Sequence, residues 1–174
     1  MATECLMGRS RILLTVAAIL GLGAGPAEPL HVRVVGVHDG DTLTALTDDK
    51  RQLKVRLHGI DAPELRQPYG QASKRALSDL VFGKQVTLHT TGTDRYKRTL
   101  AQVTVGEIEV GAQMIVTGHA WHYKQYDHTA GLEAAERNAR AARRGLWADG
   151  DAVPPWEWRA SEKNRHNREK VGER

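Results

Sequence analysis

The chain has 174 residues, enough for one domain with a hydrophobic core and short additional segments. Its 25 Lys and Arg against 21 Asp and Glu give a net charge of +4, which favours polyanionic partners but is weak support on its own. The single cysteine, Cys5, excludes an intramolecular disulfide framework. We therefore expect a domain that is stabilised by its core alone.

The first 27 residues have the composition of a secretory signal peptide. Arg9 and Arg11 precede an uncharged apolar stretch, Ile12 to Gly25. An ordinary membrane-spanning helix needs about 20 residues, so this stretch is too short to be one. Cleavage after Ala27 suits the small residues preferred at such sites and would remove Cys5 with the signal. We therefore expect a mature protein that is secreted or periplasmic.

Three strands are expected at the start of the mature chain. His31–Val37 is rich in valine, and Thr42–Thr47 alternates threonine with apolar residues. After a turn, a third strand carries apolar side chains on one face, at Leu53, Val55 and Leu57. Because side chains alternate along a strand, Arg56 would project from the opposite face. An antiparallel meander is the simplest arrangement of the three.

The apolar pattern then changes to that of a helix. From Tyr69 to Phe82 the apolar residues fall on one helical face, and Gly83 follows as a C-terminal cap. Strand patterns return at Gln85–His89 and Thr99–Val105. Three strands, a helix and two strands are the order of a five-stranded Greek-key β-barrel, the oligonucleotide-binding (OB) fold. A generic α+β sandwich has the same order of elements.

Two more helices are expected after the barrel, which gives an α+β fold with about three helices. They are a short one at Val110–Thr117 and a last one at Leu132–Arg144, where Glu and Arg at four-residue spacing indicate a solvated face. Beyond them, residues 151–174 are largely polar and charged, so we expect a disordered tail, although its Pro-Trp segment could dock on the domain. The domain would then span residues 28–150.

Two short acidic segments lie next to predicted strands. Asp39-Gly40-Asp41-Thr42 precedes the second strand, and Asp61-Ala62-Pro63-Glu64 follows the third. Such residues are common in turns, but neighbouring antiparallel strands would place Asp41 and Asp61 side by side. Two adjacent carboxylates raise each other's pKa, and a bound cation removes that penalty. Because the ligands are oxygens, calcium or magnesium is preferred to zinc.

Three features of the sequence carry a family resemblance: the two acidic segments, the Val55-Arg56-Leu57 strand that precedes Asp61, and the basic run Asp94-Arg95-Tyr96-Lys97-Arg98. In these features the chain resembles the staphylococcal nuclease (thermonuclease) family. The similarity extends from about His31 to Trp147. The resemblance implies an OB-fold barrel and calcium-dependent hydrolysis of DNA and RNA that leaves 3′-phosphate ends. It also implies that calcium is bound by the carboxylates of Asp41 and Asp61 and by the backbone carbonyl of Ala62.

The same resemblance implies that the catalytic residues are Arg56, Glu64 and Arg98. Two arginines would give planar, bidentate donors to the phosphate in the transition state. Glu64 would accept the proton of the attacking water, or only orient that water or Arg56. Arg98 would stabilise the leaving oxygen rather than protonate it, because a guanidinium group gives up its proton reluctantly.

The residues expected to bind substrate are Arg95, Tyr96, Tyr123 and Tyr126. The first two match positions that contact a nucleotide phosphate in the family. Tyr126, with Tyr123 or Trp121, would stack on a base or would instead pack in the core. Lys97 departs from the family, since it replaces a glycine that commonly precedes the catalytic arginine.

Three hypotheses about function remain. The first is a secreted, calcium-dependent, sugar-nonspecific nuclease that acts as a monomer on single-stranded or locally unpaired DNA and RNA. The second is a non-catalytic OB-fold module that binds nucleic acid, which would need a basic groove but not the acidic cluster. The third is a structural protein of the cell envelope that has kept the scaffold, and it predicts no metal binding.

Overall fold

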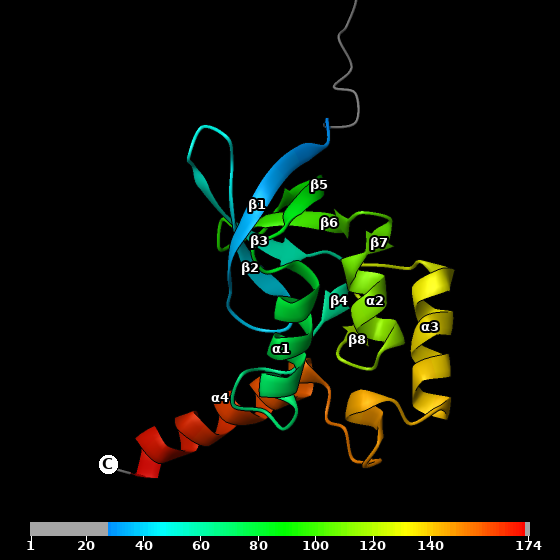
Figure 1. The fold of residues 1–174 in the computed structure, drawn as a ribbon. Helices are drawn as coiled ribbons and strands as arrows, with labels where there is room; N and C mark the ends of the chain where they lie inside the picture. The colour runs from blue at the N-terminus through cyan, green and yellow to red at the C-terminus, as the bar shows by residue number, and fades with distance from the viewer. Residues whose placement is uncertain (1–27, 173–174) are drawn as a thin grey trace, which may run out of the picture.

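A closed five-stranded β-barrel forms the centre of the computed structural model, which describes residues 28–172 (Figure 1). Its strands are β1 (Leu30–Val37), β2 (Thr42–Leu46), β3 (Gln52–Leu57), β5 (Gln85–Thr93) and β6 (Thr99–Val105). Antiparallel pairings connect them in the order β3-β2-β1-β5-β6, and a parallel pairing of β3 with β6 closes the ring. The expected OB-fold barrel is confirmed. The predicted signal peptide, residues 1–27, lies outside the described residues.

The barrel encloses an apolar core because its strands turn alternate side chains inward. Fully buried side chains come from all five strands, among them Val32, Val34, Leu43, Val55, Leu88 and Val103. Burying a side chain of this size contributes about 1.5–3 kcal/mol to folding. On β3, the residues between the inward-facing ones are polar, and they include Arg56.

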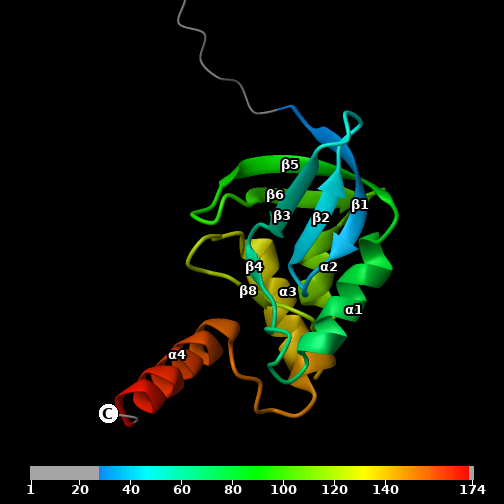
Figure 2. The ribbon, with the colours of Figure 1, turned by 90° about the vertical axis from the view of Figure 1, so that its left-hand side faces the viewer.

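Three helices cover one side of the barrel, and a fourth extends away from it (Figures 1 and 2). They are α1 (Gly70–Val81), α2 (Val110–Val116), α3 (Ala130–Ala141) and α4 (Pro155–Gly172). The remaining elements are the short strands β4 (Ile60–Asp61), β7 (Ile108–Glu109) and β8 (Trp121–His122) and a 3₁₀ turn, η1 (Gly145–Trp147). Among residues 28–172, no helix combines the length and apolar character that crossing a membrane requires.

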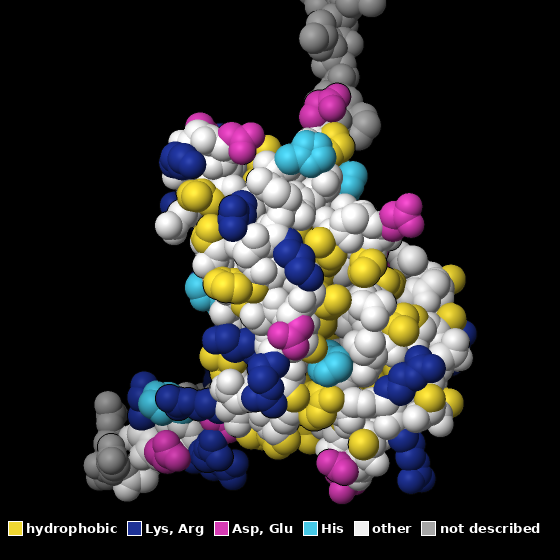
Figure 3. Space-filling model, viewed as in Figure 1, with side chains coloured by type: hydrophobic (Ala, Val, Ile, Leu, Met, Phe, Trp, Pro, Cys, Tyr) yellow, Lys and Arg dark blue, Asp and Glu magenta, His cyan; other side chains and the backbone are white. Residues whose placement is uncertain are grey.

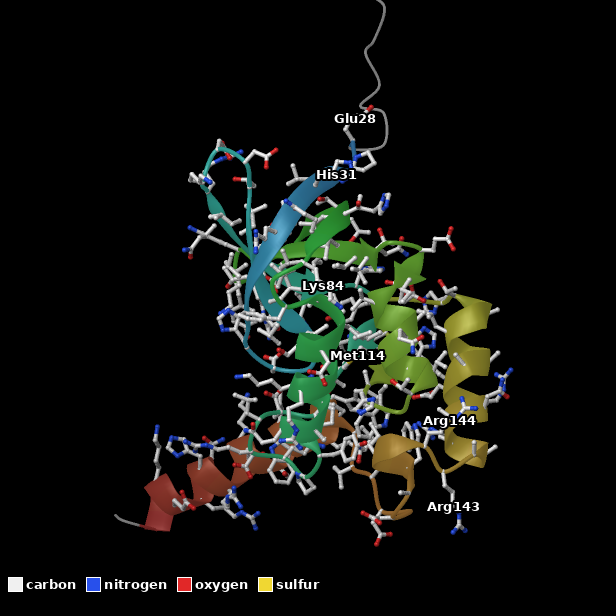
Figure 4. All side chains as sticks on the ribbon, viewed as in Figure 1. Glu28, His31, Lys84, Met114, Arg143 and Arg144 are labelled. Carbon is white, nitrogen blue, oxygen red and sulfur yellow. The ribbon has the colours of Figure 1, made fainter. Side chains whose placement is uncertain are left out.

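Helix α2 lies between α1 and α3, and it completes the core beneath the barrel. Its Met114, labelled in Figure 4, is fully buried. On α3, the expected ion pairs form, with 3.1 Å between Glu136 and Arg140 and 3.6 Å between Glu133 and Arg137. Glu136 is nevertheless buried, and its carboxylate accepts a 3.3 Å hydrogen bond from the backbone N–H of His122. The face predicted to be solvated is therefore partly a contact with β8.

Helix α4 differs from the disordered tail expected from residue 151 onward. It begins at Pro155, and proline is favourable in the first turn of a helix. Its start is attached to the domain, because Trp156 stacks on Tyr123 with ring centroids 5.5 Å apart. The Gln67 side chain also donates a 2.6 Å hydrogen bond to the Val153 carbonyl. The helix has no apolar stripe, which is why the sequence pattern does not predict it.

Candidate active site

Asp41 lies at one end of the barrel, where the chain passes from β1 to β2. The residue is 5% exposed, and its carboxylate accepts hydrogen bonds from the Ala62 backbone N–H at 2.7 Å and the Thr42 hydroxyl at 3.0 Å. Gly40 allows this approach, because a Cβ there would lie 1.9 Å from Ser73 Oγ and 2.7 Å from Ala62 Cβ. The two acidic segments are thus packed directly against each other.

Asp61 lies on β4, and its position is set by the pairing of this strand with β8. Arg56, on the polar face of β3, connects it to Asp41: Nη2 donates to Asp61 Oδ1 at 2.8 Å, and Nη1 forms an ion pair with Asp41. Burial lowers the pKa of Arg56, and the charges of Asp61 and Asp39 oppose that shift. Since a guanidinium group keeps its proton, the structure brings two carboxylates to one cation.

Arg98 is held in place by Asp94. Arg98 Nε donates to one carboxylate oxygen at 2.7 Å, and the backbone N–H groups of Arg98 and Tyr96 donate to the other at 2.9 and 2.8 Å. Burial alone would raise the pKa of Asp94, but these hydrogen bonds outweigh it and leave the pKa below its ordinary value. The Arg98 Nη1 atom lies 3.5 Å from Thr42 Oγ1, so this loop reaches the acidic pair.

Asp94 was not among the predicted site residues. A sequence signal does exist, since an aspartate at the start of a turn often accepts backbone N–H groups and here has an arginine four residues later. Within the turn, Lys97 has a φ of 62°, the left-handed conformation that costs glycine least. The turn therefore forms with Lys97 at the position where the family commonly has glycine, but the backbone of Lys97 is strained.

The aromatic side chains divide between the rim of the site and the core. Tyr96 and Tyr126 are 65% and 62% exposed, so their rings are accessible. Tyr123 lies between Tyr126, in an edge contact, and Trp156, which covers one of its faces. Trp121 is buried and packs edge-on against Trp147, which assigns it to the core and removes it as a stacking residue.

One cleft of about 650 Å³ brings these groups together. Its lining includes all the predicted site residues: Asp41, Arg56, Asp61, Ala62, Glu64, Arg95, Tyr96, Arg98, Tyr123 and Tyr126. It also includes Arg159 of α4, which the sequence analysis missed. Nothing in the pattern around Arg159 points to the site, because its contacts depend on how α4 docks.

The acidic groups have the donor chemistry of a site for a hard divalent cation. Asp41 and Asp61 supply carboxylate oxygens, and Ala62 directly follows Asp61 and donates its backbone N–H to Asp41. Within residues 28–172, no group of three or more His, Cys, Asp or Glu side chains is arranged to hold a metal. A cation here would therefore use two carboxylates together with backbone and water oxygens, which calcium and magnesium accept.

Several known proteins are similar to this chain in sequence. The family described as staphylococcal nuclease homologue matches residues 54–149, which contain Arg56, Asp61, Glu64 and Arg98. A protein of Haemophilus influenzae described as an uncharacterized endonuclease is 46% identical over 155 residues, which cover 88% of this chain and 87% of that protein. This chain belongs to the staphylococcal nuclease homologue family.

Two further proteins are similar to this chain. An Escherichia coli O157:H7 protein, also described as an uncharacterized endonuclease, is 44% identical over 131 residues, or 75% of this chain and 85% of that protein. A probable staphylococcal-like nuclease of Oryza sativa subsp. japonica is 40% identical over 128 residues, or 72% of this chain. The match covers only 35% of the rice protein, so this chain corresponds to about a third of it.

Proposed function

We propose that this protein is a calcium-dependent nuclease that hydrolyses phosphodiester bonds of DNA and RNA and leaves 3′-phosphate ends. The family and the relatives described as endonucleases support the nuclease activity. The observation that carries the finer proposal is the convergence of Asp41 and Asp61 on Arg56, in a cleft that also contains Glu64 and Arg98.

Asp41, Asp61 and the backbone carbonyl of Ala62 would hold the cation. Once bound, calcium would withdraw charge from a phosphate oxygen of the substrate. The side chains of Asp41 and Asp61 are 7% and 1% exposed, so water screens their negative charge poorly and a divalent cation between them would be strongly attracted. All proposed donors are oxygens, which is the preference of calcium and magnesium.

Arg56 and Arg98 would stabilise the negative charge that develops on the phosphate. Arg56 is held at the cleft by Asp41 and Asp61, and Arg98 is held there by Asp94, so both guanidinium groups are near the proposed reaction site before substrate binds. Their planar guanidinium groups can each donate two parallel hydrogen bonds to phosphate oxygens. Arg98 would act on the leaving oxygen as a donor that keeps its own proton.

Glu64 would accept the proton of the attacking water. It lies in the loop between β4 and α1, where its backbone N–H donates a 3.1 Å hydrogen bond to the Gln67 side chain. Gly70, the first residue of α1, packs on this loop so closely that a Cβ would lie 1.9 Å from the Glu64 carbonyl oxygen. The loop is therefore well fixed, while the Glu64 side chain is 40% exposed to the cleft and to solvent.

The rim of the cleft favours unpaired bases. Tyr96 and Tyr126 offer exposed rings for stacking, and Arg95 lies beside Tyr96, with its guanidinium carbon 4.8 Å from the ring centroid. We propose single-stranded or locally unpaired DNA and RNA as the substrate. The composition of residues 1–27 further supports a site of action in the periplasm or outside the cell, and we take a monomer as the active form.

The test is digestion of denatured DNA by the purified protein with calcium or with a chelator. We expect cutting only with calcium, a loss of at least 100-fold in Glu64→Gln and Arg98→Ala, and full activity in the control Arg137→Ala, an exposed residue of α3. Cutting that survives both substitutions would place the active site elsewhere. Binding of DNA without cutting under any cation would show a non-catalytic module instead.

A further inference from the structure

Arg159 of α4 occupies the carboxylates of the site described above. Its Nη2 atom donates to Asp61 Oδ2 at 2.8 Å, and its Nη1 atom donates to Glu64 Oε1 at 2.8 Å and to Asp61 Oδ1 at 3.2 Å. Burial alone would lower the pKa of Arg159, but the hydrogen bonds to Asp61 and Glu64 raise it above its ordinary value. The contact joins residues more than 90 positions apart in the chain.

The anchoring of α4 keeps Arg159 at the cleft. Trp156 lies one turn earlier on the helix and stacks on Tyr123, their rings inclined by only 4°. Gln67, in the loop that carries Glu64, holds the Val153 carbonyl just before the helix begins. The start of α4 is therefore fixed on the domain. The long Arg159 side chain, which is 42% exposed, extends from it to the carboxylates.

The Asp61 carboxylate cannot keep all its hydrogen bonds to Arg159 while it binds a divalent cation. Both of its oxygens accept hydrogen bonds from Arg159, and one of them also accepts from Arg56. Two positive charges a few ångströms apart repel each other strongly in a site screened from water. Binding of a cation to Asp61 would thus displace the Arg159 guanidinium by a short distance while α4 stays in place.

The displaced guanidinium would lie beside Arg56 and Arg98 in the cleft, where a phosphate group is expected. A guanidinium fork that binds a carboxylate in a bidentate way matches a phosphate equally well. Beyond Arg159, α4 carries more basic than acidic side chains, as its outer face shows in Figure 3. Among the described residues of α4, Arg159 is the one that lines the cleft, so no phosphate contact is assigned to the rest of the helix.

We propose that Arg159 is a further substrate-binding residue, which exchanges Asp61 and Glu64 for a phosphate group of the nucleic acid when a divalent cation binds. The proposal rests on the proposed function, because it assumes a cation at Asp41 and Asp61. It predicts two opposite effects of one substitution: loss of Arg159 strengthens cation binding and weakens nucleic-acid binding. A residue that only supported the structure would weaken both.

The first measurement is calorimetric titration of calcium into the full-length protein without nucleic acid. We expect Arg159→Gln to bind calcium about tenfold more tightly than the wild type, because a competing cation is removed. Arg165→Gln is the matched control: Arg165 lies on the same helix, is 61% exposed and forms an ion pair with Glu162 of α4. Its calcium affinity should equal that of the wild type.

The second measurement is binding of single-stranded DNA with phosphorothioate linkages, in saturating calcium and at several salt concentrations, with the strand checked for integrity afterwards. We expect Arg159→Gln to bind the DNA more weakly. The slope of log K against log salt is negative, and its magnitude should decrease by about 0.7, the value for one lost phosphate contact on a single strand. Arg165→Gln should keep the wild-type slope.

Unchanged or weaker calcium binding in Arg159→Gln would overturn the proposal, as would unchanged DNA affinity and salt slope. Equal effects in Arg165→Gln would overturn it too, since they would show a general charge effect of α4. If neither the wild type nor Arg159→Gln binds calcium, the cation in the proposed function fails as well. Calcium binding by the wild type without an effect of Arg159→Gln would instead leave the proposed function intact.

Discussion

Gly40 packs against Ser73 so closely that a Cβ at position 40 would lie 1.9 Å from Ser73 Oγ and 2.8 Å from Ser73 Cβ. The contact joins the loop that carries Asp41 to helix α1. Ser73 cannot easily move away, because it is fully buried and its hydroxyl donates a 2.6 Å hydrogen bond to the His119 carbonyl. The position of the acidic pair therefore depends on a glycine in the core packing of the domain.

Gly40→Ala should lower the free energy of unfolding by about 1–3 kcal/mol, since overpacking forces the loop or α1 to shift. The same shift would move Asp41, so calcium affinity should fall with stability. Gly36→Ala is the control, because a Cβ there meets its nearest neighbour, Thr44 Cβ, at an ordinary 3.6 Å. Denaturant unfolding measures both variants, and equal stabilities would contradict the predicted clash.

Asp61→Asn should destabilise the fold by about 3 kcal/mol, because it removes one of the two carboxylates that pair with buried Arg56 and the carboxylate that binds Arg159. Calcium binding should be lost as well. The control Glu133→Gln removes an equally direct ion pair with Lys124, but on the exposed surface of α3, where we expect no measurable change. Denaturant unfolding at neutral pH compares the two, and equal losses would show that burial of the Arg56 pair is unimportant.

Asp94 should make stability depend on pH in a defined direction. Its pKa in the folded protein lies below the ordinary value of 3.8, so ionised Asp94 stabilises the fold. That contribution is complete well above pH 3.8 and is lost as the pH falls through the lower, folded-state value. The unfolding free energy of the wild type minus that of Asp94→Asn should therefore shrink on acidification below pH 4, whereas a constant difference would contradict the shift.

Lys97→Gly should raise the unfolding free energy by up to about 1 kcal/mol and keep nuclease activity, because glycine relieves the left-handed conformation of this residue. Lys50, with a φ of 65° in the turn between β2 and β3, provides a matched control far from the cleft. Lys50→Gly should show a similar change in thermal or denaturant unfolding. Loss of activity in Lys97→Gly alone would show that the lysine side chain itself acts on substrate.

Most of the barrel can be predicted from sequence because its strands alternate apolar and polar residues, as Leu53, Val55 and Leu57 do on β3. Where alternation is missing, prediction falls short. The polar Thr90–Thr93 segment lengthens β5 beyond the expected end at His89, and two-residue strands such as β4 and β8 leave no pattern at all. These elements depend on tertiary pairing rather than on local preference.

The candidate site follows the same division. Asp41, Arg56 and Asp61 could be placed near one another because strand pairing relates β2 to β3 and the acidic segments flank those strands. Arg159 could not, since its contact with Asp61 requires α4 to dock through Trp156 across a cleft formed by distant segments. Asp94 lies between these cases, because its turn is local but its role in holding Arg98 is visible only in the hydrogen bonds.

A crystal structure of the protein grown with saturating calcium tests the central claim most directly. We predict anomalous density for one calcium ion between the carboxylates of Asp41 and Asp61 and next to the Ala62 carbonyl, with Arg159 moved off Asp61. A structure at the same calcium concentration that has no ion at this position, with Arg159 still bound to Asp61 and Glu64, would contradict it.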